Sequence, residues 1–348
     1  MDRRLFTLSS LVLVASILCR VALTGAGEER SPGSPRTGEK VFGAAADLIA
    51  ALDEKQLAKA LMDPGSEERI NWHFIPRDRK GLPLKELDES KRAKGIALLK
   101  AGLSEEGARK AQAIMAHEAI LREIEKGAGF VRDPLLYYVS FFGKPTRDGR
   151  WGWRMEGHHL SLNFTLSGSE VVSFTPAFYG SNPAEVMDGP HKGLRLLAEV
   201  EDLGRDLVTS LTKDQLAECL TEAEEQVPKE VPGPGTSRYE GPLPKGLIGK
   251  RLDDGQRRKL RDLIHEYTRN FPDDLVAGIS AGSLDEVHFA WRGGFKPLEA
   301  HSYLVHGPRF AINYTDIQNG ANHVHSCLRM LAGEFGLPGE KPKPTQAF

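Results

Sequence analysis

The hydrophobic pattern of this chain changes its period near Tyr137, and that change limits the folds that the chain can adopt. From Val41 to about Lys126, apolar residues recur at the three- and four-residue spacing of amphipathic helices. After Tyr137, short segments rich in aromatic and β-branched residues are separated by Gly, Pro or Ser, which is typical of strands joined by tight turns. The order predicts an α+β fold, with a helical N-terminal layer packed on a mainly antiparallel sheet.

Three further helical patterns interrupt the strand-like segments, and they begin at Lys192, Lys213 and Gly255. They predict a helical insertion between strands. Residues 227–246 contain too much Pro and Gly for a helix or a strand, so we expect a long surface loop there. Because the strands on both sides of this loop need one another as partners, we expect residues 41–348 to form a single α+β domain.

A short pattern recurs three times, as LDEKQ from Leu52, LTKDQ from Leu211 and LDDGQ from Leu252. In each copy Asp or Thr stands three residues before Gln, so both side chains can bond the free amides at the start of a helix. We find no wider similarity around the three copies. We therefore interpret them as helix capping boxes and not as parts of a duplicated unit.

Residues 1–26 have the organisation of a secretory signal peptide. MDRR is followed by the apolar run Leu5–Leu18, and Thr24 and Ala26 fit the small-residue positions of a cleavage site. The run is shorter than the ~20 residues that a membrane-spanning helix needs. We predict export to the periplasm or the extracellular space; an uncleaved anchor is the alternative.

Residues 27–40 are polar, contain Gly and Pro and lack periodicity, which predicts a flexible spacer. After signal cleavage the chain keeps Cys219 and Cys327, which in an exported protein either form one bridge or stay two buried thiols. The 46 basic and 48 acidic residues give a net charge of -2, so no strong field favours nucleic acid or an anionic membrane. We expect no nucleic-acid partner, no stable membrane span after cleavage and no nucleotide cofactor.

The segment NHVHS contains the sharpest chemical signal. His323 and His325 are separated by one residue, so both project from the same face of a strand and can present two imidazoles to one metal ion. Such a pair needs further ligands, and the adjacent His158 and His159 are the candidates. These four histidines predict a divalent metal site for zinc, copper or iron. The alternative is that their rings only hydrogen-bond to buried polar groups.

The segment WGWRMEGHHLSLNFT places His158 and His159 side by side. If residues 151–166 form one strand, the two rings point to opposite faces of the sheet. Gly157 is the position where a bulge would most easily bring them together. The apolar run after His158 marks the core face, so we expect His159 to lie on the polar face.

Further residues could serve catalysis or ligand binding. His159 and His306 are candidates for a general base, because the pKa of histidine lies near neutral pH. Arg154 and Arg309 could orient a carboxylate or phosphate of a small-molecule substrate. We therefore hypothesise a metal-dependent enzyme, a hydrolase first and an oxidoreductase second. The alternative is a secreted ligand- or carbohydrate-binding module that stacks its ligand on tryptophans and has purely structural histidines.

Several motifs together resemble the domain-of-unknown-function family numbered 3500: WGWRMEGHHLSLNFT, TPAFYGSNPAEV, FAWRGG, NGANHVHS and RDPLLYYVSFFGKP. The resemblance extends over nearly the whole chain after the signal segment. The family has no established activity, so the resemblance implies no role for the histidines. This chain has Asn313 where relatives tend to have an acidic residue in the strand after GP. If that acid were a ligand or a base, Asp316 would have to substitute for it.

Overall fold

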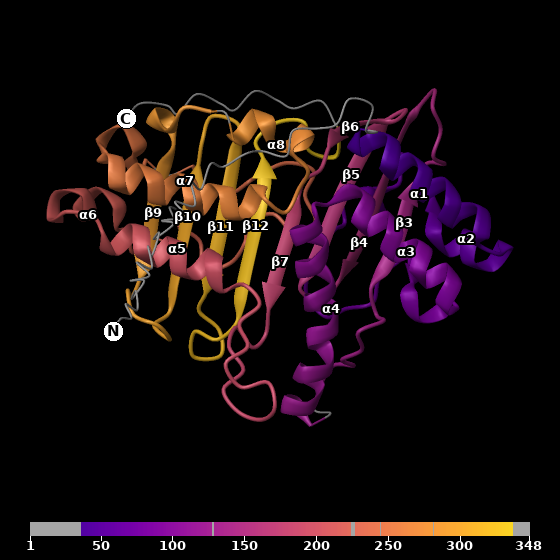
Figure 1. Ribbon diagram of the computed structural model, residues 1–348, viewed down its shortest axis with the longest axis horizontal. Coiled ribbons are helices and arrows are strands. Elements are labelled where there is room, and N and C mark those ends of the chain that lie inside the picture. The colour runs from indigo at the N-terminus through magenta and orange to yellow at the C-terminus, as the bar shows by residue number, and fades with distance from the viewer. Residues whose placement is uncertain (1–35, 127–128, 224–226, 244, 281, 337–348) are drawn as a thin grey trace, which may run out of the picture. The chain divides into compact units, whose positions relative to one another are not determined.

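One large sheet organises the fold. The computed structural model describes residues 36–126, 129–223, 227–243, 245–280 and 282–336, so the predicted signal peptide lies outside the described residues. The strands of the sheet are β1 (Leu61–Met62), β2 (Leu82–Pro83), β3 (Tyr138–Phe142), β4 (Arg150–Gly157), β5 (Leu160–Ser167), β6 (Glu170–Ser173), β7 (Ala177–Ser181), β8 (Leu247–Ile248), β9 (His288–Gly293), β10 (His301–His306), β11 (Phe310–Asp316) and β12 (Val324–Met330). Their order is β1-β3-β4-β5-β7-β12-β11-β10-β9-β8, with β2 beside β3 and β6 beside β5 (Figure 1).

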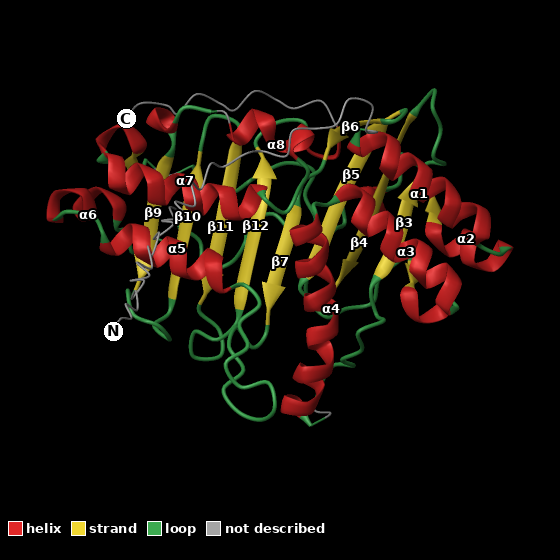
Figure 2. Ribbon diagram, in the orientation of Figure 1, coloured by secondary structure: helices red, strands yellow, loops and turns green. Residues whose placement is uncertain are grey.

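Helices cover one face of this sheet (Figure 2). The predicted α+β fold is confirmed, including the helical layer before the first long strand and the helical insertion between β7 and β9. Helix α1 begins at Thr37, so residues 37–40 of the expected spacer are helical. None of the described helices is long and apolar enough to cross a membrane. The helices are α1 (Thr37–Ala51), α2 (Glu54–Ala60), α3 (Glu89–Gly102), α4 (Glu105–Glu125), α5 (Ala198–Thr209), α6 (Lys213–Cys219), α7 (Asp254–Thr268) and α8 (Asp273–Ser280).

The main hydrophobic core lies between the helices and the sheet, and a smaller apolar cluster forms around Trp72, Phe74, Phe178 and Cys327. Every tryptophan of the chain is at most 1% exposed. The expected tryptophan surface for stacking a carbohydrate is therefore absent from the fold, because packing in the core uses these rings. Cys219 and Cys327 are both buried and free, which matches the two-thiol alternative.

The two halves of the sheet have the same strand pairing. Trp153 of β4 pairs with Phe164 of β5, and Tyr303 of β10 pairs with Tyr314 of β11. Each residue of the second pair follows its counterpart in the first pair by 150 positions. β7 and β12 form an antiparallel pair at the centre of the sheet. From either edge toward this pair, the strands follow one another in chain order. The sheet therefore consists of two repeats related by an approximate twofold axis between β7 and β12.

The helices repeat as well. In the first repeat (residues 37–181), α1 and α2 precede β1, which is parallel to β3; in the second (residues 198–330), α5 and α6 precede a parallel bridge from Leu220 to Trp291. The sequences GLPLKELDESKR and GLIGKRLDDGQR occupy matching places, as do LNFT and INYT. The Gln pattern thus marks helix starts, as expected, within two structural repeats that the sequence did not reveal. Side chains have diverged while the backbone pairing has stayed the same.

The three predicted capping boxes are confirmed, with the pairs Asp53 and Gln56, Thr212 and Gln215, and Asp253 and Gln256. In the second repeat the two glutamine side chains, Gln215 and Gln256, exchange hydrogen bonds of 2.8 Å in both directions. In the first repeat Gln56 accepts a bond from Lys91, which occupies the position equivalent to Gln256. The boxes therefore begin helices and also join the helices of each repeat.

Candidate metal centre

His158 and His159 form a tight turn, which differs from the continuous strand expected over residues 151–166. Gly157 at the end of β4 pairs with Leu160 at the start of β5, so the two histidines are the whole connection of a hairpin. His159 has a φ of 61°, the left-handed conformation that such turns require and that Gly or Asn usually supplies. The turn places His159 at the end of the sheet, beside the start of β12.

His323 and His325 come from the second repeat. His325 lies on β12 and pairs with Gly180 of β7, and His323 immediately precedes the strand. Their rings lie close together, with centroids 4.7 Å apart, as the alternation in NHVHS predicts. Because β12 is the neighbour of β7 at the centre of the sheet, these rings meet the turn of the first repeat.

The nitrogens of three histidines converge. Nε2 of His159 lies 2.8 Å from Nε2 of His323 and 3.3 Å from Nε2 of His325. One ligand atom from each residue can be chosen so that all of them lie within 4.8 Å of one another. Ligand nitrogens about 2.1 Å from one tetrahedral zinc ion lie about 3.4 Å apart. The separations in the His159–His323–His325 triad therefore lie within about 1.5 Å of those in a tetrahedral zinc site.

A carboxylate and two aromatic rings hold His325 in place. Oε1 of Glu230 lies 2.8 Å from Nδ1 of His325, and the rings of Phe74 and Phe178 contact the imidazole. A carboxylate that accepts the Nδ1 proton leaves Nε2 with its lone pair directed at the other two histidines. Glu230 belongs to the Pro/Gly-rich loop, where no periodicity indicated its role.

The surroundings of His159 and His323 favour the neutral form of both rings. Burial lowers the pKa of His159 well below its usual value, and the nearby imidazoles of His158, His325 and His323 lower this pKa further. Burial, followed by the proximity of His325, lowers the pKa of His323 to about 3. Metal ions bind the neutral imidazole, so protons do not compete with a metal at these two residues near neutral pH.

His158 lies outside the triad, although its ring stacks on that of His159 with centroids 3.8 Å apart. Its Nδ1 lies 2.5 Å from Oε1 of Glu118 and 3.2 Å from Nη1 of Arg132. Arg132 in turn donates two bonds to Glu125. The structure therefore directs this predicted ligand toward a buried carboxylate on α4. Glu118 was missed in the sequence, although an acidic residue on a helix face otherwise expected to be apolar could have indicated a buried partner.

Asp316 does not replace the acidic residue expected near Asn313 as a direct member of the triad. Its Oδ1 accepts a bond of 2.8 Å from the backbone N–H of His323. Burial raises the pKa of Asp316 to about 6. This carboxyl group therefore fixes the backbone that carries His323.

Other predicted site residues lie away from the triad. The Arg154 guanidinium is fully buried and donates to Oε1 of Glu68 at 2.6 Å, with Glu156 3.1 Å away, so its charge is neutralised inside the protein.

His306 stacks on His288 at the end of β10, with ring centroids 4.8 Å apart. Arg309 lies in the turn after β10, at the opposite end of the sheet, and donates to the carbonyl of Gly278. The structure does not bring Arg154, His306 and Arg309 together with the triad.

Comparison with known proteins gives one match. Residues 35–337 match the model of a family described as "Protein of unknown function (DUF3500)". No curated protein and no solved structure matches the chain.

Proposed function

This chain belongs to the DUF3500 family, a family of unknown function, and from the geometry of its histidines we propose that it binds a divalent transition metal and uses it in catalysis. The convergence of His159, His323 and His325 is the observation that carries this proposal. Nε2 of His159 lies 2.8 and 3.3 Å from the Nε2 atoms of His323 and His325, and all three ligand atoms lie within 4.8 Å of one another, which is close to the spacing of ligands around a small ion.

The proposed roles follow from the contacts of each residue. His159, His323 and His325 hold the ion through Nε2, and Glu230 fixes the tautomer of His325. Three protein ligands leave a position for water or substrate, as in catalytic zinc sites. An ion bound there would lower the pKa of a water molecule or polarise a substrate oxygen.

We place hydrolysis first and oxidation second. Three imidazole ligands suit zinc, which has no redox chemistry, and the same ligands also suit copper and iron. His159 is a ligand in this proposal, so its Nε2 is not available as a general base. The identity of the metal in the purified protein separates the two reactions: zinc supports a hydrolase, whereas copper or iron supports an oxidoreductase.

Metal analysis of the purified chain tests the proposal. We expect about one zinc, copper or iron ion per chain, and we expect His323→Ala and His325→Ala each to reduce this content to about a tenth or less. His265→Ala is the matched control, because this histidine is exposed on α7 and lies far from the triad in the sheet order. Circular dichroism verifies that each variant is folded. A folded wild-type chain that stays metal-free after incubation with zinc, copper and ferrous iron would overturn the proposal.

Export remains part of the proposal. The charged start, the apolar run Leu5–Leu18 and the small residues near Ala26 support a cleaved signal peptide. Expression of the full chain in a bacterium, followed by fractionation and N-terminal sequencing, tests this. We expect a mature chain that begins at Gly27 in the periplasm or the medium. A full-length chain that stays in the cytoplasm would contradict it.

A further inference from the structure

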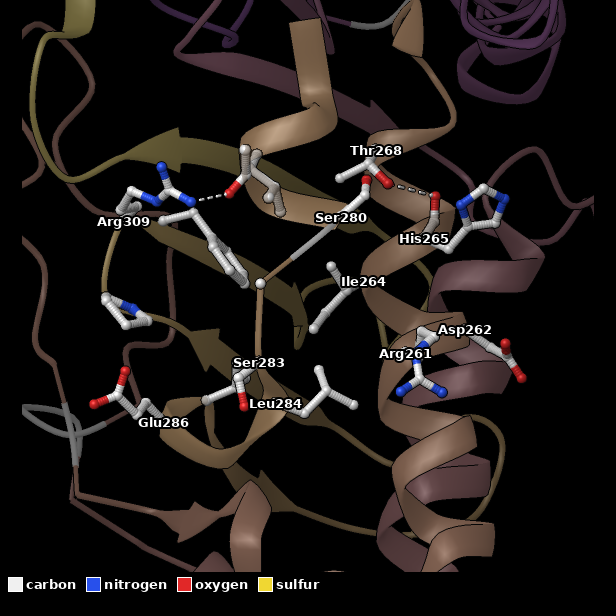
Figure 3. Close-up of a pocket in the computed structure, with 16 residues that line it drawn as sticks. Arg261, Asp262, Ile264, His265, Thr268, Ser280, Ser283, Leu284, Glu286 and Arg309 are labelled. Carbon is white, nitrogen blue, oxygen red and sulfur yellow. Dashed lines mark hydrogen bonds between the residues drawn. The ribbon is translucent and has the colours of Figure 1, made fainter. Parts of the chain in front are cut away.

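The second repeat contains a cavity of about 440 Å³ at the end of the sheet opposite to the histidines. Helices α7 and α8, the segment after α8 and the turn between β10 and β11 surround it (Figure 3). Its floor is made of apolar side chains from the main core: Ile264, Ile279, Leu284, Val287 and Phe310. The volume is within the range of small-molecule sites, which bury an apolar ligand body against such residues.

Basic groups and hydroxyl groups surround this floor. Arg309 lies at one side and donates through Nη2 to the carbonyl of Gly278 at 2.5 Å, which fixes the position of its guanidinium. Arg261 and Ser280 also line the cavity. The carboxylates of Asp262 and Glu286, by contrast, extend away from its centre (Figure 3). Arg309 therefore offers a fixed guanidinium at one side of the cavity.

The duplication explains why a cavity occurs at this place. Arg309 is the equivalent of His159, and the backbone agrees: Gly180 N–H donates to the carbonyl of His159, and Leu331 N–H donates to the carbonyl of Arg309. A cavity of about 560 Å³ lies beside His158 in the first repeat, so both repeats are hollow next to the equivalent turn. At the equivalent position the first repeat has the imidazole of His159 and the second has the guanidinium of Arg309.

We propose that the cavity beside Arg309 binds a small amphipathic carboxylate, with the carboxylate at the guanidinium of Arg309 and the hydrocarbon part on the apolar floor. A planar guanidinium binds a carboxylate through paired hydrogen bonds that a neutral head group cannot match. The cavity lies at the other end of the sheet from the triad, so this site does not depend on the proposed metal function.

Calorimetry with octanoate tests this site in the full chain, and octanol serves as the neutral ligand of the same length. We expect octanoate to bind at one site per chain and octanol to bind at least tenfold more weakly. Arg309→Gln should weaken octanoate binding about tenfold to a hundredfold, because it removes a charged hydrogen-bond donor. Arg258→Gln should leave the affinity unchanged, since Arg258 is exposed on α7 and does not line the cavity.

The variant His323→Ala separates this site from the metal centre. We expect it to bind octanoate as the wild type does, whether or not it holds metal. Equal affinities for octanoate and octanol, or an affinity that Arg309→Gln does not change, would overturn the proposal. A folded wild-type chain that gives no heat of binding with octanoate at millimolar concentration would overturn it too.

Discussion

The turn between β4 and β5 and the turn between β10 and β11 occupy equivalent places at opposite ends of the sheet. The first presents the imidazole of His159 to two further histidines, and the second presents the guanidinium of Arg309 to an apolar cavity. Both turns receive the same backbone bond from the neighbouring central strand, through Gly180 in one case and Leu331 in the other. The same backbone therefore presents two different polar side chains at equivalent positions.

The comparison also explains why only one end offers a metal site among the described residues. The triad needs both repeats, because His159 comes from the first and His323 and His325 come from the second. In the second repeat Thr315 pairs with His325, whereas its equivalent in the first repeat, Thr165, pairs with Ser173. A hydroxyl group stands at the other end where a second imidazole would be needed. The two ends therefore share their strand pairing and differ in the side chains that they present.

The largest effect is expected from exchanging residues between the two turns. His159→Asn removes one ligand but suits the left-handed backbone of the turn, so we expect metal affinity to fall more than about a hundredfold in a folded protein. Arg309→His makes the reverse exchange by placing an imidazole in the second turn. We expect no metal binding at that end, because Ser173 stands where His325 stands in the triad. Zinc titration against a chelating dye measures both. A second zinc bound by Arg309→His would contradict the conclusion that this end of the sheet lacks the further ligands of a metal site.

A smaller loss of affinity is expected from Glu230→Gln. The neutral amide oxygen of Gln accepts the hydrogen bond from His325 Nδ1 more weakly than the charged carboxylate does. We therefore expect zinc affinity to fall about tenfold to a hundredfold while the three ligands stay in place. Glu240→Gln is the matched control, because Glu240 is an exposed carboxylate in the same loop. An unchanged affinity in Glu230→Gln would show that the loop does not support the metal centre.

Gly180→Ala tests how closely β7 packs against the turn at His159 and against the start of β12. A Cβ atom there would lie 2.8 Å from Cδ2 of His159 and 2.9 Å from the carbonyl of Val324. We expect a loss of about 1–3 kcal/mol in the free energy of unfolding, together with weaker zinc binding as His159 is displaced. Leu331 is the equivalent of Gly180 at the other end of the sheet. Because Leu331 lies away from the triad, Leu331→Ala should not change zinc binding. Urea unfolding and zinc titration measure the two effects. Unchanged zinc binding in a folded Gly180→Ala variant would count against this close approach.

The sequence predicted the parts of the fold and the site that depend on local periodicity. The change from helical to alternating patterns identified the α+β class, and the spacing of His323 and His325 predicted that their rings lie together. The turn at His158 and His159 was missed, because neither residue is typical of a two-residue hairpin. Glu230 was missed because its loop has no period that relates it to β12.

The duplication was missed for a different reason. Only short segments such as LNFT and INYT still agree between the repeats, and these residues are separated by long stretches in which side chains differ. Backbone pairing does not require identical side chains; it requires residues that suit a buried strand, and many do. The stacked pair Trp153 and Phe164 and the stacked pair Tyr303 and Tyr314 fill the same place with different rings. The pairing register of the strands therefore indicates the repeat more clearly than sequence identity does.

The smallest expected effect compares the helix starts of the two repeats. Gln215 is buried and exchanges two side-chain bonds with Gln256, so Gln215→Ala leaves buried polar groups unpaired, and we expect a loss of about 2 kcal/mol in the free energy of unfolding. The Gln56 side chain makes its contacts with Lys91 and Glu86 at a more exposed site, so Gln56→Ala should cost about 0.5–1 kcal/mol. Urea unfolding of both variants at one pH measures the difference. Equal losses would mean that the glutamine pair adds nothing beyond ordinary capping.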